Sequence, residues 1–347
     1  MSICLLRTSL HVGDSYLNIC SRWKHHTRKL QRPGLQLPYY LRSTLKTSNW
    51  NHSRWPGKRQ MVNSIENHFE DKYALSRLWK PLAFTITVSG TSMAGAAIWQ
   101  YENVRSQAIQ AKRWWGGYHT PKYGQFRQHM YNWWHSLSAG DKTFVPICAI
   151  NVLVFLAWAV RPWQPFMTKY FTAGLASGAL CWPMLLSVFS HYSILHLGAN
   201  MFVLHSFSDR AVSALGREQF VGLYLSAGMV SSFTSYLFKA IIKSPSSSLG
   251  ASGAVMCILG YFCCRYPESK LAIIFVPNFN FEASSGLKAL LCMDTVGCLL
   301  RWSFFDHAAH LGGSLCGIAW YYWGQEYIWR KREPLISFWH KLRGPVQ

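Results

Sequence analysis

Charged residues are absent from several long apolar intervals of this chain. The hydrocarbon core of a bilayer accommodates roughly 20 apolar residues of helix, and a charge at its centre is costly, so such intervals predict membrane-spanning helices. We predict seven spans, within residues 81–101, 143–160, 184–208, 219–238, 244–264, 286–300 and 307–325. The chain is therefore predicted to be an all-α polytopic membrane protein.

One interval is too long for a single span. The charge-free stretch 170–208 begins with a part, 171–182, that is rich in Gly, Ala, Ser and Thr. We assign that part to a loop and expect the helix to start near Met184. This start places His191 and His196 in one helix.

Composition supports a membrane protein and disfavours two other classes. Hydrophobic residues make up 50% of the 347 positions and charged residues only 14%. This is too apolar for a disordered chain, and the charged share is well below the usual value of about a quarter. Mean hydropathy is only +0.03, because a polar N-terminal part precedes a very apolar remainder. A soluble two-domain enzyme is therefore disfavoured.

The basic character of the chain, a formal net charge of +21, is concentrated partly at its start. Segment 1–65 is rich in Lys, Arg, Ser and Thr and contains one acid, Asp14, which is typical of a mitochondrial transit peptide. Acidic residues return at Glu66, so we expect the mature chain to begin near there, with 66–80 as a matrix-side segment. Basic arms also bind nucleic acid, but no nucleic-acid-binding motif follows this one, and we expect no nucleic-acid partner.

The predicted spans are arranged as one helix followed by six. A single span, 81–101, is followed by a connecting loop, 102–142, and the other six spans form a core, 143–325. The basic tail, 326–347, is expected to be exposed. The ten cysteines contain no CxxC pair, so we expect small apolar packing residues rather than disulfide partners or metal ligands.

Ionisable residues inside predicted spans are candidates for function, and here they are mainly histidines. The first group is His191, His196 and Asn200. His196 and Asn200 are four residues apart and therefore project from one helical face. Polar residues at such positions also join membrane helices through hydrogen bonds, which remains the alternative for all three.

The second group surrounds Ser252 in the sequence Gly250-Ala-Ser252-Gly253. Pro245 and the serines that follow it predict a loop and a helix cap, which places Ser252 in the first turn of a membrane helix. The free amides and positive dipole end of a helix N-terminus stabilise the negative charge that develops during acyl transfer. Gly250 permits unusual backbone dihedrals, and Gly253 with Gly260 forms a stripe of small residues. Alone, this pattern is weak, because Gly and Ser are ordinary packing residues of membrane helices.

The third group lies around His310, at the start of the last predicted span. Ala309, Gly313 and Gly317 repeat every four residues, a pattern that lets two helix backbones nearly touch. If this stripe packs on the small-residue stripe of the serine helix, His310 comes level with Ser252. A serine hydroxyl becomes nucleophilic when an adjacent base takes its proton, so the pair would form a nucleophilic site.

Together, the three groups, each on its own predicted span, resemble the motifs of the rhomboid intramembrane serine proteases. The resemblance covers roughly residues 143–325. The extra leading helix and the transit-like N-terminus resemble the mitochondrial inner-membrane branch of that family. The resemblance implies a six-helix rhomboid core with one extra N-terminal helix, in a multi-pass protein of the mitochondrial inner membrane.

The resemblance also implies chemical roles. Ser252 would be the nucleophile and His310 the general base, a dyad without the carboxylate of a Ser-His-Asp triad. Asp306, four residues before His310, and His307 are more consistent with local structure than with catalysis.

Further residues match the family's oxyanion and supporting positions. His196 and Asn200 would donate side-chain hydrogen bonds to the oxyanion, together with the backbone amide of Ser252. The supporting residues would be Gly250, Gly253 and His191. The weak span 286–300, which Lys288 and Asp294 interrupt, would suit the mobile gate that this family is thought to place opposite its His/Asn helix.

The implied reaction is hydrolysis of a peptide bond in the transmembrane segment of single-span mitochondrial membrane proteins, in protein processing and quality control. Water must then reach a polar cavity within the bilayer, and the substrate helix must unwind locally. We expect membrane lipids around the protein, and neither a cofactor nor a bound metal ion.

Two other functions are compatible with intramembrane histidines. A metal or proton transporter could use them, because imidazole binds Zn, Cu or Fe, but it would not need a GxSG sequence at a helix start. A rhomboid-like binding protein without catalytic activity is the second, although the presence of both Ser252 and His310 argues against it. A zinc intramembrane protease is disfavoured because the sequence contains no HExxH.

Overall fold

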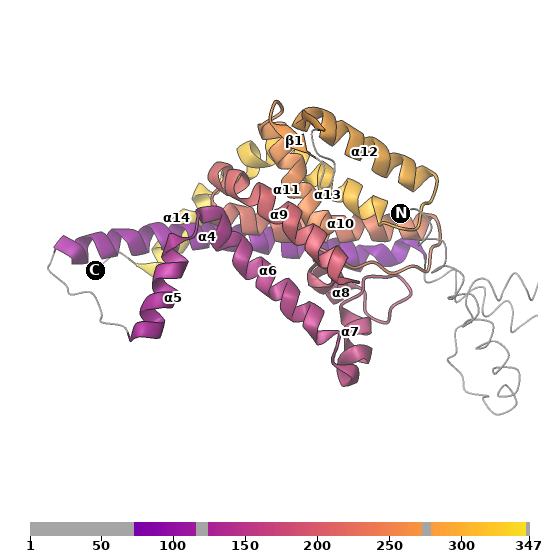
Figure 1. Ribbon diagram of the computed structural model, residues 1–347, viewed down its shortest axis with the longest axis horizontal. Coiled ribbons are helices and arrows are strands. Elements are labelled where there is room, and N and C mark those ends of the chain that lie inside the picture. The colour runs from indigo at the N-terminus through magenta and orange to yellow at the C-terminus, as the bar shows by residue number, and fades with distance from the viewer. Residues whose placement is uncertain (1–72, 116–123, 273–278, 345–347) are drawn as a thin grey trace, which may run out of the picture. The chain divides into compact units, whose positions relative to one another are not determined.

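The computed structural model describes residues 73–115, 124–272 and 279–344 (Figure 1). Most of these residues are helical. The predicted transit peptide, 1–65, and about half of the matrix-side segment, 66–80, lie outside the described residues.

Each of the seven predicted apolar intervals contains a helix. These are α4 (Trp79–Trp115), α6 (Ala139–Ala157), α9 (Ile194–Leu215), α10 (Arg217–Ile241), α11 (Ser252–Arg265), α12 (Ala283–Leu299) and α13 (His307–Ala319), which a π-helical segment, η4 (Trp320–Trp329), continues. By length and composition, three helices of the described chain could cross a membrane: Leu75–Ala111, Ala139–Ala157 and Arg217–Ile241. The one-plus-six arrangement of spans stays a prediction.

Short elements connect the long helices. They are η1 (Leu75–Leu78), α5 (Gln125–Ser136), η2 (Arg161–Trp163), α7 (Gln164–Tyr170), α8 (Cys181–Leu186), η3 (Ser187–Phe189) and α14 (Glu333–Arg343). Strands β1 (Lys270–Ala272) and β2 (Asn280–Glu282) pair antiparallel, with Lys270 opposite Glu282. The sequence analysis did not predict this hairpin.

The predicted connecting loop, 102–142, is wrong for most of its described length. Helix α4 continues to Trp115, and α5 occupies Gln125–Ser136. Charged residues end an apolar interval without ending a helix, and this stretch is rich in Ala, Gln, Arg and Lys, which favour helix. The first charged residue therefore marks the end of the apolar interval and not the end of the helix.

The predicted helix start near Met184 is also wrong. The chain forms α8 and η3, becomes extended at Ser190, and begins α9 only at Ile194. Ser193 caps α9, because its Oγ accepts the backbone N–H of His196 at 3.2 Å. His191 therefore precedes α9 and does not share a helix with His196.

The C-terminal tail, expected to be exposed, forms helix α14. None of its residues is buried, yet it is attached to α4. The Trp339 Nε1–H donates to Glu102 Oε1 at 2.8 Å, and Arg343 Nε donates to the same oxygen at 3.0 Å. Part of the basic tail thus has a fixed place on the leading helix.

The interior is organised around α10. Helices α4, α11 and α13 pack against it, α11 and α13 pack against each other, and α12 lies on α13 (Figure 1). Phe220, Leu223 and Tyr224 of α10 are fully buried in this core. The contact between α11 and α13 sets the site, because one helix begins with Ser252 and the other carries His310 in its first turn.

Candidate active site

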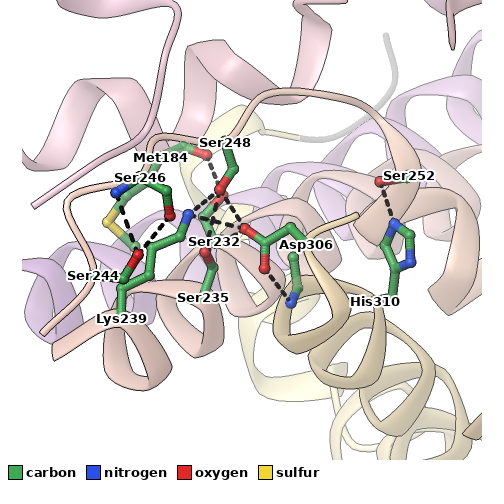
Figure 2. A network of polar contacts seen from close by, with 11 residues as sticks. Met184, Ser232, Ser235, Lys239, Ser244, Ser246, Ser248, Ser252, Asp306 and His310 are labelled. Atoms are coloured by element: carbon green, nitrogen blue, oxygen red, sulfur yellow. Dashed lines mark hydrogen bonds and ion pairs between the residues drawn. The ribbon is translucent and has the colours of Figure 1, made fainter. Parts of the chain in front are cut away.

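Ser252 and His310 are in direct contact. Ser252 Oγ lies 2.8 Å from His310 Nε2 (Figure 2). His310 is only 7% exposed, and Ser252 is half-buried. The hydroxyl can donate to Nε2 when the neutral imidazole carries its proton on Nδ1. The structure thus brings together the two residues predicted to form a nucleophilic pair.

Backbone contact between α11 and α13 holds this pair in register. A Cβ atom on Gly313 would lie 2.0 Å from the carbonyl oxygen of Gly253, and one on Gly317 would lie 2.1 Å from that of Cys257. On the facing helix, a Cβ on Gly260 would lie 2.8 Å from the carbonyl oxygen of Ser314. The predicted packing of the two small-residue stripes is confirmed.

The start of α11 is fixed by neighbouring backbone and by His191. The expected serine cap is wrong, because the N-cap is Ala251 and no side chain caps the helix. Instead, the N–H of Gly250 donates to the Ser187 carbonyl at 2.9 Å, and the N–H of Ala251 donates to His191 Nε2 at 3.5 Å. His191, which is buried, thus supports the loop that leads into Ser252.

Gly250 lets His196 approach the serine. Its φ of +137° is disfavoured for other residues, and a Cβ there would lie 2.8 Å from His196 Cε1. The Tyr192 N–H donates to His196 Nδ1 at 3.5 Å, which assigns the proton of the neutral ring to Nε2. Nε2 lies 3.0 Å from that same Cβ position, which is 3.7 Å from Ser252 Oγ. His196 therefore presents a donor beside Ser252.

Asn200 lies one turn further along α9. It is buried, and its Nδ2 donates to the His196 carbonyl oxygen at 2.8 Å. An amide nitrogen carries two hydrogens, so a second donor position remains. The structure brings Asn200 against the backbone of His196, without making it part of the cavity wall.

A cavity of about 770 Å³ opens beside the serine. Ser252, His196 and His310 line it, together with Tyr192. Aromatic side chains of the loop between α12 and α13 form another part of the wall: Trp302, Phe304 and Phe305. The Ser252 hydroxyl and the imidazoles of His310 and His196 therefore face one space that an extended peptide could enter.

Comparisons with known proteins agree with the motifs. Residues 178–326 match the rhomboid domain. The presenilin-associated rhomboid-like protein, mitochondrial, of Homo sapiens is 48% identical over 285 residues, which cover 80% of this chain and 75% of that protein. The chain belongs to the rhomboid family.

Other rhomboid relatives are more distant. The Saccharomyces cerevisiae rhomboid protein 1, mitochondrial, is 32% identical over 207 residues, covering 58% of this chain and 57% of that protein. The rhomboid protease GluP of Bacillus subtilis is 29% identical over 140 residues, covering 39% of this chain and 24% of that protein. The rhomboid domain match contains every predicted site residue but begins later than the predicted core, 143–325.

A buried polar cluster that the sequence pattern did not predict lies beside the Ser252–His310 pair. Lys239 Nζ lies 3.0 Å from Asp306 Oδ2, Ser235 Oγ donates to the same oxygen at 2.5 Å, and Ser248 Oγ contacts both charged groups (Figure 2). We call Ser235, Lys239, Ser248 and Asp306 the polar clamp. Lys239 lies near the end of an apolar interval, so only its contacts with other elements indicate a role.

The polar clamp connects the two helix starts that carry the site. Asp306 caps α13, because its Oδ1 accepts the Ala309 N–H at 3.0 Å. Ser248 belongs to the loop before Ser252 and exchanges two backbone hydrogen bonds of 2.8 Å with Ala173. The clamp therefore fixes the loop before α11 against the first turn of α13.

Breaking the clamp is expected to destabilise the protein. Lys239→Met would leave the Asp306 carboxylate, whose side chain is 18% exposed, without its cation. We expect a loss of about 2–3 kcal/mol, below the range for fully buried pairs, measured as a lower melting temperature in detergent. Adding Asp306→Asn removes the unpaired charge and keeps a capping oxygen, so it should restore most of the loss. A Lys239→Met protein that melts like the wild type would show that the clamp contributes nothing.

A buried pair of Asp294 and His307 was also not predicted from the sequence. Asp294 of α12 is completely buried, and its Oδ1 lies 2.8 Å from Nδ1 of His307. In the sequence, Asp294 is visible only as an interruption of the weak span 286–300. The partner comes from a different helix, which hydropathy along one segment does not reveal.

Proposed function

We propose that this rhomboid-family chain is an intramembrane serine endopeptidase of the mitochondrial inner membrane. The observation that carries the proposal is the 2.8 Å contact between Ser252 Oγ and His310 Nε2, at the start of a helix and on a cavity wall. In this proposal Ser252 attacks the scissile carbonyl, and His310 takes the hydroxyl proton and later transfers it to the leaving amine.

The developing negative charge on the carbonyl oxygen needs donors. The backbone N–H of Ser252, at the first position of α11, has no partner within its own helix and lies at the positive end of the helix dipole. The Nε2–H of His196 lies beside it, and Asn200 supplies a further amide close to His196. We assign these three groups to the oxyanion site.

The substrates in this proposal are single-span membrane proteins, and the setting is mitochondrial protein processing and quality control. Relatives that carry the word mitochondrial in their names, together with the basic, acid-poor segment 1–65, support a mitochondrial membrane protein with a cleaved presequence. We propose a multi-pass arrangement of one leading span and six core spans, embedded in membrane lipids.

The test of this function is labelling and cleavage by the purified full chain in detergent. A fluorophosphonate should react at Ser252, located by mass spectrometry, and a fluorogenic model substrate containing one transmembrane helix should be cut. The serine-reactive probe should block that cleavage. Labelling at Ser248, whose hydroxyl contacts Lys239, in place of Ser252 would contradict the assignment. So would the absence of both reactions, which the inactive binding protein predicts.

Removal of an oxyanion donor is expected to slow the chemical step. Asn200→Ala should lower kcat by about 10²- to 10³-fold with little change in KM. Asn151→Ala is the matched control, because Asn151 is buried on α6 and donates to the Ile147 carbonyl at 2.7 Å in the same way. It should keep the wild-type kcat. Equal losses in the two variants would assign Asn200 to helix packing.

A chelator tests for metal dependence. EDTA should leave the wild-type cleavage rate unchanged, whereas loss of cleavage in EDTA and its recovery with zinc would favour a metal-dependent function.

A further inference from the structure

Asp294 carries a carboxylate that is buried beside the Ser252–His310 pair, and only one of its two oxygens has a hydrogen-bond partner within the described part of the chain. Its side chain has no exposed surface. Oδ1 lies 2.8 Å from His307 Nδ1 and 3.5 Å from His310 Nδ1, while Oδ2 has no hydrogen-bond partner among the described residues. Burying such a group costs free energy, and ionisable residues within membrane proteins are retained mainly for function.

The two nitrogens of the His310 ring face different groups: Nε2 faces Ser252, and Nδ1 faces the Asp294 carboxylate. Nε2 faces the Ser252 hydroxyl and must be free of a proton to act as a base. The proton of the neutral ring is then on Nδ1, which has no hydrogen bond within the described part of the chain and lies 3.5 Å from Asp294 Oδ1. Catalytic contacts that are long in a resting enzyme often tighten when the substrate is bound.

We propose that Asp294 is a positioning residue for His310, a carboxylate from α12 that lies behind the Ser252–His310 pair. This inference rests on the proposed function and adds a supporting carboxylate to the Ser-His dyad that the family resemblance implies. Asp294 would hold the His310 tautomer with Nδ1 protonated and stabilise the imidazolium that forms during the reaction.

The proton balance of the acylation step is simple. The Ser252 Oγ–H bond breaks, its proton moves to His310 Nε2, and Oγ forms a bond to the carbonyl carbon, which becomes a tetrahedral oxyanion. The imidazolium then carries protons on both nitrogens, and the charge faces Asp294. Collapse of the oxyanion breaks the C–N bond, and the Nε2 proton goes to the leaving amine.

His307 contacts the same carboxylate oxygen, at 2.8 Å from its Nδ1. Its ring occupies a space that exists only because residue 297 is glycine, since a Cβ on Gly297 would lie 2.5 Å from the ring. The rings of Phe304 and Phe305 lie 5.3 and 6.0 Å from it and shield the pair on one side. The competing explanation is that Asp294 serves only to anchor His307 and thereby joins α12 to α13.

Other titratable or charged groups lie around His310. His196 on α9, Lys239 on α10 and Arg301 in the loop after α12 line the same cavity. Asp294 on α12 and His307 on α13 lie beside the His310 ring, and Asp306 is the N-cap of α13. Asp306 is committed elsewhere, because it pairs with Lys239 and caps α13 on the side away from the Ser252–His310 contact (Figure 2). Asp294 is therefore the carboxylate available to the imidazole.

The test compares Asp294→Asn with His307→Gln in the full chain in detergent. The readouts are the pH dependence of fluorophosphonate labelling, substrate cleavage and the melting temperature. In a Ser-His-Asp triad, the Asp→Asn change lowers kcat by about 10⁴. Because the contact here is longer, we expect a loss of at least about 10² for Asp294→Asn. The loss of the carboxylate that faces His310 should also change the pH dependence of labelling.

His307→Gln should retain the wild-type pH midpoint and lose less than about tenfold in rate, since it leaves the carboxylate beside His310. If Asp294→Asn does not fold, Asp294→Ala replaces it, and formate but not formamide should restore part of the rate. The proposal is overturned if Asp294→Asn labels at the wild-type rate and midpoint, or if His307→Gln reproduces both changes. Activity that survives Ser252→Ala would instead overturn the proposed function itself.

Discussion

Ser252→Ala should abolish both cleavage and fluorophosphonate labelling while the protein remains folded. The deleted hydroxyl is a small part of a half-buried residue, so the helix contact between α11 and α13 should survive. Without the Oγ atom no acyl-enzyme can form, and loss of a serine nucleophile costs about 10⁶ in kcat in a well-studied serine protease. Cleavage of the one-span substrate should fall to background, and the melting temperature should stay within a few degrees of wild type.

Two further variants sharpen this result. Ser226→Ala removes a buried hydroxyl from α10 that bonds to the Gly222 carbonyl at 2.7 Å, and it should leave the rate unchanged. His310→Gln should be nearly as inactive as Ser252→Ala, and the double variant should be no worse, because the two residues act as a unit. Residual cleavage by Ser252→Ala well above that of the double variant would mean that another group is the nucleophile.

Most of the long helices could be predicted from hydropathy, because each of them coincides with a long apolar interval of the sequence. The predicted helix boundaries were wrong where a side-chain hydrogen bond or helix propensity, and not a change in hydropathy, determines where the helix begins or ends. Ser193 starts α9 through a side-chain hydrogen bond, and the charge-free interval around it contains no sign of the break. The opposite error occurred at α4, where polar residues with high helix propensity extend the helix to Trp115.

The part of the site that could be predicted from the sequence is the part marked by small-residue stripes and by the family motifs. The Gly313 stripe implied close contact between two helices, and the family resemblance identified Ser252 and His310. The polar clamp and Asp294 could not be found in this way. Lys239 pairs with Asp306 across 67 positions, and Asp294 pairs with His307 across a turn between two helices. Such pairs depend on the rotation of each helix about its axis, which one sequence does not specify.

Gly313→Leu should inactivate the protein by separating the two helices that carry the site. A Cβ at this position would lie 2.0 Å from the Gly253 carbonyl oxygen and 2.8 Å from its carbon. Backbone cannot move aside as a flexible side chain can, so the helices must shift and the 2.8 Å contact between Ser252 and His310 must open. Overpacking of this kind costs at least about 1–3 kcal/mol. A displacement of about 1 Å at a catalytic pair costs about a hundredfold in rate.

The measurement is the rate of fluorophosphonate labelling at Ser252 beside the melting temperature. Gly95→Leu is the matched control, because Gly95 lies within a helix that is long and apolar enough to cross a membrane but has no atom within 4 Å of its Cβ position. It should label at the wild-type rate. Gly313→Ala supplies a graded step, since its methyl group already meets the Gly253 carbonyl, and it should label more slowly than Gly95→Leu. A folded Gly313→Leu protein that labels like the wild type would show that this backbone contact does not set the distance between Ser252 and His310.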